Sequence, residues 1–178
     1  MKKFLIILFV LLLITPLAMA DVKLGVSGNL EFATSSDVQS IQSGDITKLI
    51  RPGIFFEWYN PTGFGIDSTL VTTLPDTNNN IDFFLTVDPT YHFLSLKIID
   101  LSIFAGPGII GESNTVNLGK ITSAAWFLQL GGGPTVYLGP LFVQARGAVR
   151  FTIGNGSFIG SQALVDDIEL ALIAGLKL

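Results

Sequence analysis

The sequence contains no cysteine and few charged residues, and both shortages narrow the classes of protein to which it can belong. Without cysteine the chain has no disulfide, no thiolate zinc site and no N-terminal cysteine to carry a lipid. Only 13% of its 178 residues are charged, against the roughly 25% that is usual in soluble domains. Its 10 basic residues are outnumbered by 14 acidic ones, so we expect no nucleic-acid partner.

Long apolar runs are missing except at the N-terminus. Residues 1–20 begin with two lysines, continue with an apolar run that reaches Ile14, and end in Ala18-Met19-Ala20. This order is typical of a secretory signal peptide and its cleavage site. The run is short for a permanent helical anchor, which needs about 20 apolar residues. We therefore expect residues 1–20 to be a signal peptide and residues 21–178 to form one exported domain.

The rest of the chain alternates apolar and polar residues almost from end to end. Between residues 22 and 32 the even positions are mostly large and apolar, whereas the odd positions are small or polar. A period of two predicts a β-strand with one apolar face. The same pattern recurs in residues 50–59, 64–74, 81–93, 101–109, 126–136, 141–151 and 168–178. Most of these segments match the ~9–11 residues that a tilted strand needs to cross a bilayer.

Long and short connections alternate between the predicted strands. Residues 60–63, 95–98 and 139–140 form tight turns, whereas the long polar loops are residues 34–47, 75–80, 111–123 and 154–164. Outer-membrane barrels have short turns on the periplasmic side and longer loops outside. The alternation therefore predicts an all-β fold, an eight-stranded antiparallel up-and-down transmembrane β-barrel, with both ends of the mature chain in the periplasm.

Side-chain volume decides which face of the strands points outward. An eight-stranded barrel has an interior that side chains just fill, so the many large apolar residues do not fit inside it. The other face is mainly Gly, Ala, Ser, Thr and Asn, which suits a narrow lumen and lacks the Lys and Glu of a soluble surface. A lipid-facing barrel is thus favoured over a soluble lipocalin-like carrier. The aromatic residues expected at the lipid interface are Trp58, Phe64, Tyr91, Phe93 and Trp126.

The Gly-rich second half resembles the small eight-stranded outer-membrane proteins, such as the OmpA transmembrane domain and OmpX. The segments that carry the resemblance are Phe104-Ala105-Gly106-Pro107-Gly108, Leu128-Gln129-Leu130-Gly131-Gly132-Gly133 and Phe142-Val143-Gln144-Ala145-Arg146-Gly147. The resemblance implies a monomer in the bacterial outer membrane, with the lipid bilayer, periplasmic chaperones and the barrel-insertion machinery as partners. Leu178 stands where such proteins usually end in an aromatic residue.

Three carboxylates are expected to lie together inside the barrel. Counting residues across the turn at 60–63 places Glu57 opposite Asp67, and counting across the 75–80 loop places Asp67 near Asp88. Such crowding is costly unless cations lie close by. The inward cations on the seventh predicted strand are Arg146 and Arg150. Two further carboxylates, Asp167 and Glu169, are expected near Arg150.

This network has two interpretations. It either plugs the lumen, as is usual for a barrel of this width, or forms a gate whose ion pairs exchange to open a narrow pore, which resembles behaviour attributed to OmpA. Four inward phenylalanines either tighten the plug or line an apolar route of the kind found in OmpW-like barrels: Phe55, Phe84, Phe104 and Phe127.

Motifs that would indicate catalysis or a cofactor have the wrong context. Residues 106–111 match G-x-G-x-x-G, but a polar loop follows where a dinucleotide site needs a helix. His92, the one histidine, falls beside a periplasmic turn, where a bond to Asp100 is favoured over the role of a catalytic base. The serines of the loops have no base partner visible in the sequence. We therefore expect no catalytic residue, no cofactor and no metal.

The favoured function is a structural or adhesin-like surface protein that binds an extracellular ligand through residues 34–47, 111–123 and 154–164. A narrow or gated channel for small or apolar solutes is the main alternative. A lipid A-modifying enzyme and a soluble carrier rank below it.

Overall fold

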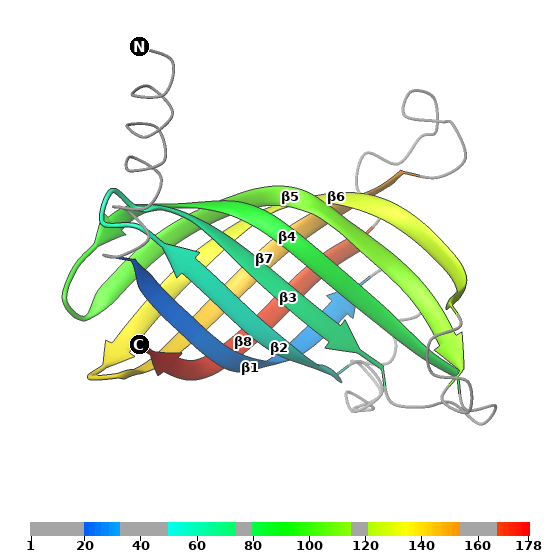
Figure 1. Cartoon of the computed structure of the whole chain (residues 1–178), viewed down its shortest axis with the longest axis horizontal. Helices are drawn as coiled ribbons and strands as arrows, with labels where there is room; N and C mark the ends of the chain where they lie inside the picture. The colour runs from blue at the N-terminus through cyan, green and yellow to red at the C-terminus, as the bar shows by residue number, and fades with distance from the viewer. Residues whose placement is uncertain (1–19, 33–49, 74–79, 115–120, 154–166) are drawn as a thin grey trace, which may run out of the picture.

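The computed structural model describes residues 20–32, 50–73, 80–114, 121–153 and 167–178. The strands are β1 (Asp21–Phe32), β2 (Ile50–Tyr59), β3 (Phe64–Thr72), β4 (Asn80–Ser95), β5 (Ile99–Asn114), β6 (Ile121–Leu138), β7 (Leu141–Ile153) and β8 (Asp167–Lys177). Each strand pairs antiparallel with the next, and β8 pairs with β1 to close the barrel (Figure 1). The predicted eight-stranded antiparallel barrel is confirmed.

The strand ends form two groups. The three tight turns, the start of β1 and the end of β8 lie together at one end of the barrel, here called the short-turn end (Figure 1). The strand ends that flank the undescribed segments lie at the other, long-loop end. The predicted signal peptide falls almost wholly outside the described residues and stays a prediction. Among the described residues, no helix is long and apolar enough to cross a membrane.

The turn between β2 and β3 shows how the sequence reverses the chain at the short-turn end. The side-chain oxygen Oδ1 of Asn60 accepts hydrogen bonds from the backbone N–H groups of Thr62 and Phe64, at 3.0 and 3.2 Å. Gly63 adopts a φ of 89°, a conformation that glycine reaches without a steric penalty. Asparagine and glycine at these positions are typical of tight turns.

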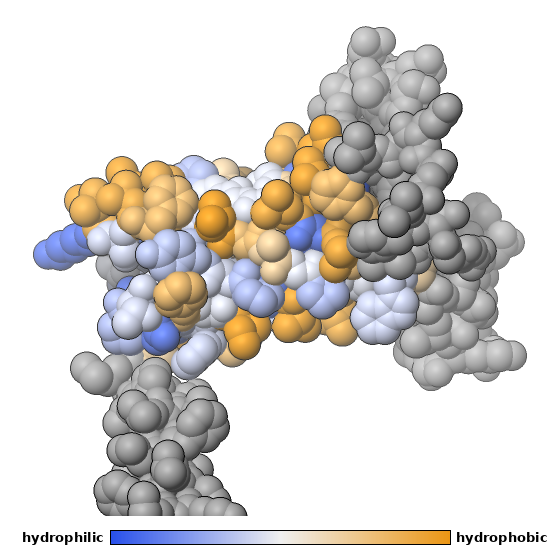
Figure 2. All heavy atoms as spheres, turned by 90° about the horizontal axis from the view of Figure 1, so that it is seen from above, coloured by the Kyte–Doolittle hydropathy of each residue, from blue (hydrophilic) through white to orange (hydrophobic). Residues whose placement is uncertain are grey.

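The large apolar side chains of the alternating strands lie on the outside of the barrel. Figure 2 shows them covering much of the visible wall, with paler small and aromatic residues between them. The aromatic residues that the sequence predicted for the lipid interface all point outward, with Trp58 half-buried and Phe64, Tyr91, Phe93 and Trp126 exposed. Phe64 contacts Tyr91 across β3 and β4, with ring centroids 4.6 Å apart.

Two predicted boundaries at the long-loop end are wrong. The loop at 111–123 is shorter than expected, because β5 continues to Asn114 and β6 begins at Ile121. The third strand ends at Thr72 instead of reaching residue 74, which lies outside the described residues. The register pairs Asp82 with Glu112, so the backbone ladder continues through polar residues. Polar composition predicted a loop there, but a ladder that extends beyond the lipid does not need apolar side chains.

Candidate functional site

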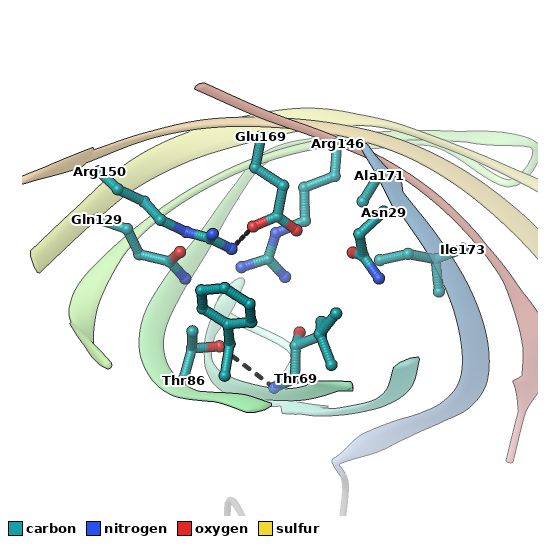
Figure 3. A pocket seen from close by; sticks show the side chains of 11 residues that line it. Asn29, Thr69, Thr86, Gln129, Arg146, Arg150, Glu169, Ala171 and Ile173 are labelled. Atoms are coloured by element: carbon teal, nitrogen blue, oxygen red, sulfur yellow. Dashed lines mark hydrogen bonds and ion pairs between the residues drawn. The ribbon is translucent and has the colours of Figure 1, made fainter. Parts of the chain in front are cut away.

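The lumen is filled by side chains and carries most of the buried polar groups. A small, partly enclosed cavity in the lumen measures about 10 Å³, near the least volume that holds one water molecule. Figure 3 shows its lining, with Arg146, Arg150 and Glu169 opposite Thr69 and Thr86. The Asn29 Oδ1 and Thr69 Oγ1 atoms are buried there without a hydrogen-bond partner among the described residues.

Arg146 forms the middle layer of the network by reaching across the lumen from β7. Its Nη2 donates to Asp67 Oδ1 at 3.1 Å and to Asp88 Oδ2 at 3.2 Å, and its Nη1 forms an ion pair with Asp67 Oδ2 at 3.0 Å. The Gln129 amide donates to the same Asp88 oxygen at 2.6 Å. The guanidinium carbon also lies 3.4 Å from the centroid of the Phe104 ring. A planar, bidentate cation stacked on an aromatic ring is an arrangement that arginine makes and lysine does not.

A second layer lies nearer the short-turn end and centres on Glu57. Lys23 Nζ lies 2.7 Å from Glu57 Oε2 and 3.8 Å from Asp100 Oδ2. His92 sits between the same two carboxylates, with Nε2 2.7 Å from Glu57 Oε1 and Nδ1 2.7 Å from Asp100 Oδ2. The bond between His92 and Asp100 that the sequence predicted is therefore present. All four side chains are buried.

Two tyrosines close this short-turn layer. The Tyr137 hydroxyl donates to Asp100 Oδ2 at 3.0 Å, and the two hydroxyls of Tyr59 and Tyr137 lie 3.4 Å apart. The Tyr59 ring stacks on His92 with centroids 4.2 Å apart. Lys23 Nζ lies 4.9 Å from the Tyr59 centroid, a distance at which cation–π attraction adds to the ion pair.

The third layer, toward the long-loop end, pairs Arg150 of β7 with Glu169 of β8 (Figure 3). The guanidinium carbon of Arg150 lies 4.9 and 5.2 Å from the ring centroids of Phe84 and Phe127. Asp167 is the backbone partner of Arg150 in the register, and its side chain lies outside the described residues. All three layers therefore combine carboxylates, a cation and aromatic rings.

The predicted carboxylates share a register row but not a cation. The register pairs Glu57 with Asp67 and Asp67 with Asp88, but among these three carboxylates Arg146 pairs with the two aspartates and Lys23 pairs with Glu57. Sequence reasoning missed Lys23, which is the direct cross-strand partner of Glu57. Lys23 shares the inward face of the first strand with Ser27 and Asn29, so the alternation made it identifiable as a lumen cation. Its depth was not, because the long segment between β1 and β2 leaves their register undetermined.

The glycines of residues 106–111 belong to the barrel wall. All of them lie in β5, which continues to Asn114 without a helix. A Cβ atom on Gly106 would lie 2.6 Å from Asp88 Oδ1, and one on Gly108 would overlap the Phe127 ring. These glycines therefore make room for lumen side chains, and the dinucleotide interpretation fails.

Comparison with known proteins identifies the fold. No family model and no curated protein sequence matches the chain. Among solved structures, the N-terminal β-barrel domain of Pseudomonas aeruginosa OprF matches 89% of this chain and 97% of its own length, with a TM-score of 0.61 and 14% identity. Neisserial surface protein A matches 89% and 96%, with a TM-score of 0.53 and 13% identity. The chain has the fold of the eight-stranded outer-membrane barrels.

In this outer-membrane barrel fold, His92 does not have the surroundings of a catalytic base. Both of its ring nitrogens face carboxylate oxygens, and its side chain is buried between the tyrosine pair and Glu57. Ser102 of β5 is the cross-strand register partner of His92, but both ring nitrogens of the histidine are already occupied by carboxylates. A general base needs a ring nitrogen that can reach the proton it removes, so the geometry favours a structural role for His92.

Proposed function

We propose that this protein is an outer-membrane barrel with a closed lumen, exported by its residues 1–20, and that it acts as a structural or surface-interaction protein. The observation that supports the proposal is that three ion-paired layers of side chains lie across the lumen, and that the cavity lined by Arg146, Arg150 and Glu169 measures only about 10 Å³. A pore needs a continuous water path, and these layers lie across that path. Ligand binding would then rest on the connections at the long-loop end, which include residues 34–47, 154–164 and the segment 115–120 between β5 and β6.

Conductance in planar lipid bilayers tests the closed lumen. We expect the purified protein to insert without producing steady single-channel currents, because each layer spans the lumen with side chains held by ion pairs. Insertion must be verified in parallel by the difference in gel mobility between unboiled and boiled protein. Reproducible open-channel currents from the folded wild-type protein would contradict the proposal.

A gated channel is the second candidate, and the Arg146 layer is the observation that favours it. Asp88 Oδ1 is buried and has no hydrogen-bond partner among the described residues, so the layer is only partly satisfied. Glu169 lies on the next strand, and both it and Arg146 line the one-water cavity (Figure 3). An Arg146 side chain that exchanged its aspartates for another carboxylate would unblock the middle of the lumen.

The gate predicts that Arg146→Ala gives single-channel currents where the wild type gives none or gives smaller ones. Arg146→Lys keeps the charge but loses the bidentate contact, and Lys177→Ala at the short-turn rim serves as the matched control. Gel mobility shows whether each variant is folded. If folded Arg146→Ala and the wild type are both silent, the gate is excluded and the plug stands.

A further inference from the structure

The short-turn end has two chemically different halves. One half consists of the β4–β5 and β6–β7 turns and carries six exposed aliphatic side chains, here called the apolar arc: Leu94, Leu96, Ile98, Ile99, Leu138 and Leu141. The other half consists of the β2–β3 turn and the paired ends of β1 and β8. It presents Asn60, Thr62 and the ion pair between Lys177 and Asp21, whose charged atoms lie 2.9 Å apart, and its exposed aliphatic residue at the chain end is Leu178.

The two turns of the apolar arc form one continuous surface. The backbone N–H of Tyr137 donates to the carbonyl of Ile98 at 2.8 Å, which ties the β4–β5 turn to β6. Leu138 and Leu141 are cross-strand partners at the start of the next turn. Leu96, Ile98, Leu138 and Leu141 are 57%, 59%, 64% and 53% exposed. Figure 2 shows hydrophobic side chains gathered at this end of the barrel.

The arc continues the outer wall past the exposed aromatic residues of β4. Tyr91 and Phe93 are exposed on that strand, and Leu96 follows Tyr91 by five residues, or about 16 Å along an extended strand. Figure 1 shows the β4–β5 turn extending farther from the barrel than the β2–β3 turn. A register shift between His92 and Leu94 lets two successive side chains, Phe93 and Leu94, face outward here. The apolar outer wall therefore runs without a break into the turn.

We propose that the apolar arc is immersed in the lipid of the periplasmic leaflet, at the boundary between acyl chains and headgroups. Continuity with the lipid-facing wall supports this occupant, because no polar belt separates the arc from the wall. The tip of the turn also supports this placement. Lys97 is exposed between Leu96 and Ile98, and its long side chain can reach the lipid phosphates while those two apolar side chains stay in the lipid. The polar half stays in water, so the barrel axis is tilted toward the β4–β7 side.

Site-directed labelling tests this placement, and the absence of cysteine makes every introduced thiol unique. Leu96→Cys and Leu138→Cys report on the arc, and Thr62→Cys reports on the polar half of the same end. Val26→Cys reports on the outer wall, where the native side chain is 66% exposed and paired with Ile54 at mid-strand. Each variant is labelled with an environment-sensitive fluorophore and folded into vesicles of phosphatidylcholine and phosphatidylglycerol, with iodide on both sides.

If the arc is immersed in lipid, iodide should quench the labels at residues 96 and 138 at least about threefold less than the label at residue 62. Their quenching should be about as weak as that of the label at residue 26. Quenching at 96 and 138 as strong as at 62 overturns the proposal, because only lipid is present to cover the arc. A label at residue 26 that is quenched strongly shows instead that the barrel is not in the bilayer. The two failures are therefore distinguishable, and all four changes are on the surface, where folding is least affected.

Discussion

Replacing Glu57 with alanine should lower the free energy of unfolding by about 3–5 kcal/mol, the usual cost of removing one member of a buried ion pair. Lys23 and Glu57 are 0% and 1% exposed, so neither water nor lipid headgroups can take over the lost contact. The variant leaves Lys23 Nζ with Asp100 as its nearest carboxylate at 3.8 Å, and removes the acceptor of His92 Nε2. Urea unfolding in phospholipid vesicles, followed by tryptophan fluorescence, measures the change.

The rim pair between Asp21 and Lys177 provides the matched control for Glu57. It joins the same two kinds of charge at 2.9 Å, but its side chains are 45% and 31% exposed. Solvated pairs contribute about 0–1 kcal/mol, so Asp21→Asn should leave the free energy of unfolding nearly unchanged. Equal effects of Glu57→Ala and Asp21→Asn would mean that the short-turn layer is hydrated in the membrane and that the lumen is not sealed at that end.

Much of the lumen network followed from residue counting, because tight turns fix the register of the strands they join. The turn at 60–63 determines that Glu57 faces Asp67, and alternation determines that both point inward. The role of Lys23 was missed because its depth in the lumen depends on two pairings between strands that no tight turn joins: the β1–β2 register and the closure of β1 on β8. The aromatic partners of Arg146 and Lys23 were missed for a related reason. The spacing of residues in the sequence does not show which side chains meet across the lumen.

The strands themselves were predictable because a membrane barrel imposes one rule on every residue of its wall. Apolar side chains face lipid and small or polar ones face the lumen, so a period of two identifies each strand. The rule holds only within the lipid, and it failed where β5 extends to Asn114 and β6 starts at Ile121. There the backbone ladder continues the strands through polar residues. The apolar arc at the other end is the reverse case, a turn composed like lipid-facing wall.

The seam between β1 and β8 should be among the positions least tolerant of added volume. Gly25 and Gly175 are register partners on the inner face of this seam, and the Phe142 ring packs over Gly25. A Cβ atom on Gly175 would overlap the carbonyl oxygen of Leu24, which is backbone and cannot rotate away. Gly175→Ala therefore requires the two strands to separate where the barrel closes. We expect a loss of about 3 kcal/mol in the free energy of unfolding.

Gly28→Ala is the control for Gly175→Ala, because it adds the same methyl group to the same seam on its outer face. Nothing lies within 4 Å of a Cβ atom at Gly28, and its register partner on β8 is Leu172. The methyl group would meet lipid, and the unfolded chain would lose conformational freedom, so the variant should match or exceed the wild type by up to about 1 kcal/mol. Vesicle unfolding of both variants measures the difference. Equal stability of the two would show that β1 and β8 are not packed at Gly25 and Gly175, and that the closure of the barrel depends on outer-wall contacts instead.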